Sequence, residues 1–166
     1  MNVIFIILFT SLTSLIAKSS SGVKPTDDPS LRIKHFRLSP LHLALDGYDP
    51  VSYFQSGPVK GKSSITYDYK GIRYHFANDV NKNEFITKPD LYEPAWGGWC
   101  GHAMAVRGEK VEINPLCYKI INNRNVLFYK TFWANALTNW ENEIKKTPEN
   151  ELMKKGDQFW SGILNQ

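Results

Sequence analysis

The sequence predicts a small single-domain α+β fold in which two short β-hairpins pack against several helices. Two segments alternate apolar and polar residues around a turn signal, and the segments beside them repeat apolar residues every three or four positions. The composition agrees, because hydrophobic residues make up 42% of the chain and aromatic residues 13%. A length of 166 residues leaves room for one such domain and little else.

The first 17 residues form an apolar block without a charged side chain, whose length fits a secretory signal better than a membrane span of about 20 residues. We predict a signal peptide that ends at Ala17, a periplasmic or secreted protein, and no stable membrane span after cleavage. Because no Lys or Arg lies near Met1, an uncleaved signal anchor that tethers the protein to a membrane is the alternative. Residues 18–40 are polar and rich in Ser and Pro, which predicts a flexible tether with a short ordered piece at 31–38.

The folded domain is expected to cover residues 41–147. Asp49 can cap a short helix that starts at Pro50, since proline is well suited to the first helical position. The first hairpin consists of Ile65–Tyr69 and Ile72–Phe76, joined by a two-residue turn that contains glycine. Alternation places one side of its second strand in the core.

In the middle of the chain, the sequence pattern predicts a helix, a short strand and the second hairpin. The pair Asn78-Asp79 can cap a helix that runs to about Thr87. Short strands are expected at 111–113 and 119–121. The second of these pairs with a strand at 126–129 across a polar turn.

Two amphipathic helices are expected in the last third of the chain. The first ends near Thr147, and the second covers residues 148–166 and packs back on the domain. The apolar face of the first helix is predicted to consist of Phe132, Trp133, Ala136, Leu137, Trp140 and Ile144.

The charge distribution argues against nucleic acid as a partner. The net charge is +4, from 20 Lys and Arg and 16 Asp and Glu, and the two signs are interspersed without a basic run of five or more residues. A solvated face explains these charges, and a mild attraction to anionic membrane surfaces is left open. We predict no enzyme, because the chain shows no Ser-His-Asp order, no paired acids in a glycine-framed cleft and no phosphate loop.

The segment Pro94–Met104 concentrates more groups able to bind a metal than any other part of the chain. Its three glycines disfavour helix and strand and predict a compact turn that lets Cys100 and His102 converge. With Met104 as a third ligand, these groups form a soft set suited to copper or zinc. His75, on the polar side of the first hairpin, is a weaker candidate for completing it.

Two alternatives to a metal site stay open at this stage. In one, Cys100 is a small buried hydrophobe, His102 bonds to backbone and the tryptophans belong to the core. In the other, Cys100 pairs with Cys117, as an oxidising compartment would permit. A disulfide across that loop would stabilise the fold by about 3 kcal/mol in the loop-entropy model.

Four motifs together resemble one known family. The motifs are Gly47–Phe54, Tyr69–Asn78, Phe85–Pro89 and Gly97–Cys100, and they span most of Leu43 to Trp140. In this combination the chain resembles the exported YHS-domain proteins of bacteria. The resemblance implies a small α+β module related to the metal-associated, cysteine-rich domains of metallochaperones, metal sensors and heavy-metal pumps.

The chain departs from those relatives where their metal is held. At the three positions where the relatives carry cysteines, this sequence has Ser52, Ala77 and Asn81. A hydroxyl, a methyl and a carboxamide cannot replace three thiolates for a soft ion, so that mode of binding is not carried over. The expected function is a non-enzymatic binding module for a metal ion through the Cys100 loop. The alternative is a structural or protein-interaction domain that binds no metal.

Overall fold

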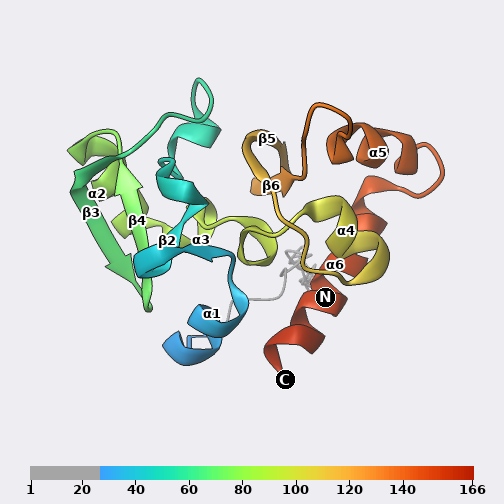
Figure 1. Ribbon diagram of the computed structural model, residues 1–166, viewed down its shortest axis with the longest axis horizontal. Helices are drawn as coiled ribbons and strands as arrows, with labels where there is room; N and C mark the ends of the chain where they lie inside the picture. The colour runs from blue at the N-terminus through green and yellow to red at the C-terminus, as the bar shows by residue number, and fades with distance from the viewer. Residues whose placement is uncertain (1–26) are drawn as a thin grey trace, which may run out of the picture.

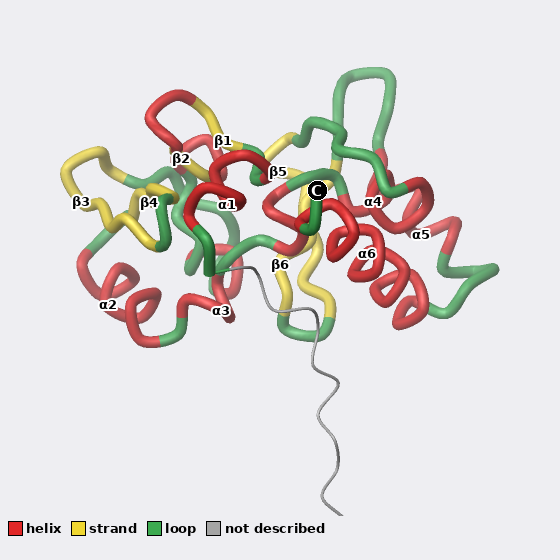
Figure 2. The backbone as a smooth tube through the Cα atoms, turned by 90° about the horizontal axis from the view of Figure 1, so that it is seen from below, coloured by secondary structure: helices red, strands yellow, loops and turns green. Residues whose placement is uncertain are grey.

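The computed structural model describes residues 27–166, so the predicted signal peptide and the first part of the predicted tether lie outside it. The elements form two groups, with a four-stranded sheet of order β1-β2-β4-β3 in one and the β5-β6 hairpin in the other (Figures 1 and 2). This arrangement confirms the predicted α+β fold. The strands are β1 (Leu38–Ser39), β2 (Leu43–Ala44), β3 (Lys62–Tyr69), β4 (Ile72–Phe76), β5 (Asn114–Ile121) and β6 (Arg124–Phe128). The helices are α1 (Pro29–His35), α2 (Asp79–Thr87), α3 (Pro89–Tyr92), α4 (Gly101–Arg107), α5 (Ala136–Glu143) and α6 (Glu149–Leu164).

Both predicted hairpins are present, and each turns on residues with left-handed backbone angles. Lys70 and Gly71 join β3 to β4 with φ of 47° and 83°, and Asn122 and Asn123 join β5 to β6 with φ of 49° and 58°. Such turns match the natural twist of paired strands. The expected strand at 111–113 is wrong, because those residues are irregular and β5 begins at Asn114.

The first group is organised around an aromatic core. Alternation along β4 buries Ile72, Tyr74 and Phe76, as predicted. Phe85 of α2 packs against the rings of Tyr74 and Phe76, with centroid separations of 4.7 and 5.4 Å. Asn78 caps α2 by accepting from the backbone N–H of Asn81.

Residues 29–40, at the end of the predicted tether, are ordered, and they include the short ordered piece expected at 31–38. Helix α1 is capped by Asp28, contacts both β4 and α6, and buries Arg32 completely. The Arg32 guanidinium forms an ion pair with Glu93 and lies 4.5 Å from the centroid of the Phe36 ring. This helix is held by a buried cation whose partner lies 61 residues away, so the sequence of the helix shows no apolar period.

Helix α6 closes the second group and packs on the domain, as expected for the C-terminal segment. It buries Leu152, Gly156 and Trp160 against the preceding elements. Within residues 27–166, no helix is long and apolar enough to cross a membrane.

Candidate functional site

The glycine-rich segment links the two groups and is a packing element. We call residues Ala95–Gly98 the glycine loop. Trp96 in this loop is buried, and its Nε1 donates to Asp157 Oδ1 at 2.9 Å. The indole lies so close to Gly156 of α6 that a Cβ there would fall 2.4 Å from the Trp96 ring. A Cβ at Gly97 would meet the ring of Trp160 at 2.8 Å, so the glycines at both contacts allow the indoles to pack closely.

Cys100 is buried and does not reach the surface. Its side chain is 1% exposed, and its sulfur accepts a hydrogen bond from the Tyr129 backbone N–H at 3.3 Å. The Cys100 N–H donates to the Val111 carbonyl at 3.0 Å, which fixes the residue at the start of α4.

His102 and Met104 lie on α4, where residues two apart face directions about 200° apart. His102 is half-buried; burial and the charge of Arg107 lower its pKa, whereas Glu143 of α5 opposes this shift. Met104 is fully buried.

His75 belongs to the other group of elements. It is half-buried on β4, and burial together with Arg73 and Lys60 lowers its pKa. Across residues 27–166, no three His, Cys, Asp or Glu side chains are grouped so that they could hold a metal. Metal binding by Cys100, His102, Met104 and His75 stays a prediction.

The two cysteines of the chain are free thiols in the structure. Cys117 is buried, and its sulfur donates to Asn135 Oδ1 at 3.6 Å. Burial raises the pKa of the Cys117 thiol, and the neighbouring Cys100 thiol adds to this shift.

The three positions that the predicted resemblance matches to metal-binding cysteines meet at Asp49, two of them at its buried carboxylate and Ser52 at its main-chain carbonyl. The side chain of Asp49 is fully buried, and its Oδ2 accepts from the Ala77 N–H at 2.9 Å and from Asn81 Nδ2 at 2.7 Å. The Ser52 hydroxyl donates to the Asp49 carbonyl at 2.7 Å. Asp49 Oδ1 also accepts from the Val51 N–H at 2.9 Å, which is a local turn bond. The short helix expected from Pro50 with Asp49 as its cap is instead a 3₁₀ turn at Ser52–Phe54 that follows Val51. A hydrogen-bond network thus occupies this place.

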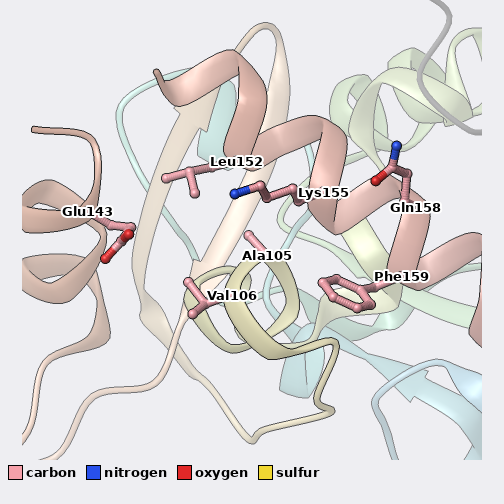
Figure 3. A pocket seen from close by; sticks show the side chains of 7 residues that line it. All are labelled: Ala105, Val106, Glu143, Leu152, Lys155, Gln158 and Phe159. Atoms are coloured by element: carbon pink, nitrogen blue, oxygen red, sulfur yellow. The ribbon is translucent and has the colours of Figure 1, made fainter. Parts of the chain in front are cut away.

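A pocket of about 440 Å³ opens between α4, the end of α5 and α6 (Figure 3). Glu143 lies on the α5 side, and Lys155 and Gln158 extend from α6. Its lining residues are Ala105, Val106, Glu143, Leu152, Lys155, Gln158 and Phe159. The pocket has an apolar wall with one carboxylate, one ammonium and one carboxamide group around it. This lining suits small amphipathic molecules but does not indicate one chemical class of ligand.

The most exposed large aromatic side chains belong to the segment that joins β6 to α5, whose backbone is drawn in orange in Figure 1. We call residues 130–135 the aromatic loop. Phe132 is 88% exposed and Trp133 is 89% exposed, and their rings meet edge to face with centroids 4.6 Å apart. Their predicted place on the core face of a helix is wrong. The helix begins only at Ala136, because Asn135 caps it by accepting from the Leu137 N–H.

The aromatic loop has a defined conformation. Lys130 and Asn135 form an antiparallel bridge at its base. Above this bridge, the Thr131 N–H donates to the Ala134 carbonyl at 2.8 Å, and the Ala134 N–H donates to Thr131 Oγ1 at 3.2 Å. These bonds hold the two aromatic residues at the tip, so their exposure belongs to the folded state.

The sequence that flanks the loop carries charges of one sign. From residue 113 to residue 140 the sequence contains three basic residues and no Asp or Glu. Two of the three are paired with acids elsewhere, Lys119 with Glu141 and Arg124 with Asp157. Lys130 is exposed and forms no ion pair with another residue of the described chain.

Comparisons of the chain with protein-family models, with curated proteins and with solved structures found no match. The functional assignment rests on the site geometry.

Proposed function

We propose that this protein is a non-enzymatic binding module that contacts a macromolecular partner through the aromatic loop. One observation carries the proposal: Phe132 and Trp133 are almost fully exposed in a loop that its own hydrogen bonds hold in shape. Aromatic side chains supply much of the binding energy in macromolecular contacts, and a preformed loop loses little conformational entropy on binding.

The contacts of the described residues give Phe132 and Trp133 no role in stabilising the fold. Each ring carries about 150–250 Å² of surface that water must otherwise solvate. At about 25 cal/mol per Å², covering most of both rings would contribute several kcal/mol to association. Selection for folding alone favours polar residues at such a tip, so binding is the better explanation.

We also propose that the chain is an exported member of the YHS-domain group. The convergence of Ser52, Ala77 and Asn81 on Asp49 supports this, because the resemblance requires these positions to be neighbours. A soft-metal site at Cys100 has weaker support, since the sulfur is buried and already accepts a hydrogen bond.

A photo-crosslinking experiment tests the proposed contact without assuming what the partner is. A benzophenone amino acid replaces Phe132 in the full chain, and in a control it replaces Leu41, which is 79% exposed in the other group of elements. Illumination in the native cells is expected to give adducts with proteins or lipids at position 132 and far fewer at position 41. Equal labelling at the two positions, or none at position 132, would contradict the proposal.

A further inference from the structure

We infer that the partner of the aromatic loop is the surface of a phospholipid membrane that contains anionic lipids, an inference that rests on the proposed function of this loop. The loop would place Phe132 and Trp133 among the headgroups and upper acyl chains. Lys130, at its base, would lie at the level of the phosphates. Three properties of the loop favour a membrane over a protein partner.

The first property is the small size of the apolar surface. The two rings offer about 300–500 Å² in total. A stable protein interface needs about 800 Å² from each partner and a polar rim that surrounds the buried centre. A two-residue tip, flanked by the exposed Thr131 and Ala134, is too narrow to provide either. A membrane surrounds an inserted tip from all sides and needs no rim.

The second property is that some of the loop's polar backbone groups, at Thr131 and Ala134, are paired within the loop. Entry into the less polar part of a bilayer is costly for backbone N–H and C=O groups without partners. The Thr131 and Ala134 N–H groups donate within the loop, and the Ala134 carbonyl accepts there. The tip can therefore lose water at lower cost than an open loop. Tryptophan is also the side chain, with tyrosine, that concentrates at membrane interfaces.

The third property is charge. The absence of Asp and Glu from residues 113–140 removes repulsion from anionic headgroups. Lys130 is exposed at the base of the loop, where a cation would meet the lipid phosphates. The net charge of +4 acts in the same direction.

Fluorescence quenching by brominated lipids tests this inference at the loop itself. Trp133 is the tryptophan with by far the greatest exposure among the five of the chain, all of which lie in residues 27–166. The full chain is mixed with vesicles of phosphatidylcholine and phosphatidylglycerol at 7:3 whose acyl chains carry bromine. We expect bromine-dependent quenching with the parent protein and its loss in Trp133→Phe, which keeps an aromatic tip but removes the reporter.

Vesicle sedimentation supplies the affinity. Phe132→Ser with Trp133→Ser is expected to lower the partition coefficient at least ten-fold relative to the control Leu41→Ser. Lys130→Gln is expected to lower it about five-fold on anionic vesicles and much less on pure phosphatidylcholine. All variants share the same residues 1–26, so differences between them arise from the substituted positions.

The outcomes separate the two proposals. Quenching that is unchanged in Trp133→Phe, or absent in the parent, overturns the membrane inference. If quenching is absent while position 132 still crosslinks strongly to a protein, the partner is a protein and the binding function stands. If both quenching and crosslinking at position 132 are absent, both proposals fail.

Discussion

The glycine loop and the aromatic loop both present an indole from a short irregular segment, yet one indole is buried and the other exposed. Trp96 lies against Gly156 and donates to Asp157. Trp133 packs edge-on against Phe132 and is otherwise open to solvent over most of its surface. Local sequence does not separate the two cases. The difference comes from helix α6, which is distant in sequence. Its Gly156 has no Cβ and so leaves room for Trp96, whereas Trp133 has no such surface to pack against.

This comparison predicts its largest effect for removal of the two indoles. Trp96→Ala is expected to lower the free energy of unfolding by about 3–5 kcal/mol, because it leaves a large cavity in the core. Trp133→Ala is expected to change it by no more than about 0.5 kcal/mol, since the ring touches little. Urea denaturation of both variants and the parent measures the difference. Similar losses in the two variants would show that the aromatic loop also stabilises the fold.

The second test addresses the surface that receives Trp96. Gly156→Ala puts a methyl group 2.4 Å from the Trp96 ring, and we expect a loss of about 2–3 kcal/mol from overpacking. Gly162→Ala, in the same helix, is the matched control. Within the described chain no heavy atom lies within 4 Å of its added Cβ, so its better helix propensity should stabilise by about 0.5–1 kcal/mol. If Gly156→Ala instead raises the free energy of unfolding, the Trp96 indole does not pack against Gly156.

The third test asks whether Cys100 is a packing residue or a ligand. Cys100→Ser is expected to cost about 1–2 kcal/mol in unfolding free energy, because a hydroxyl is harder to bury than a thiol although the Tyr129 N–H can still donate to it. Metal analysis should find equal, sub-stoichiometric copper and zinc in the parent and the variant. Stoichiometric metal in the parent that is lost in Cys100→Ser would refute the packing interpretation.

Thiol counting complements this test. Both cysteines are buried and free, so we expect two reactive thiols after denaturation and very slow reaction in the native protein. A count of zero after denaturation would indicate a Cys100–Cys117 disulfide and contradict the free thiols of the structure.

The sequence predicted what depends on neighbouring residues and missed what depends on distant ones. The hairpin at Lys70-Gly71 and the cap at Asn78 are local, and both are found. An ordered piece was expected at 31–38, but the sequence did not reveal that α1 is buried, because its Arg32 is compensated by Glu93, far along the chain.

The candidate site was missed for a different reason, which is local. Apolar spacing alone extended α5 back to Phe132, although Asn135 is a strong capping residue and marks the true start. Counting the cap before the spacing would have left the two aromatic residues in a loop. The burial of Cys100 was one of the alternatives that the sequence left open, and its contact with the Tyr129 N–H comes from outside the segment.

The smallest expected effect is a loss of stability in mild acid that originates where the glycine loop meets α1. Trp99, next to the loop, donates to the His35 carbonyl at 2.7 Å, and Lys110 Nζ lies 2.9 Å from His35 Nδ1. Burial lowers the pKa of His35, and the charges of Lys110 and Lys34 lower it further. Unfolded chains bind a proton near the ordinary value of 6.5, whereas the folded protein binds it only at lower pH.

The stabilisation from neutral His35 is therefore complete above pH 6.5 and is lost as the pH falls toward the folded-state pKa. The slope cannot exceed about 1.4 kcal/mol per pH unit for one proton. His75 and His102 have pKa values lowered in the same direction, so His35→Gln should flatten the acid limb only in part. Denaturation at pH 7.5 and pH 5.5, with the exposed His42→Gln as control, measures this. An acid limb that is as steep in His35→Gln as in the control would show that Lys110 does not disfavour the protonated ring, and that the contact between α1 and the glycine loop is insensitive to pH.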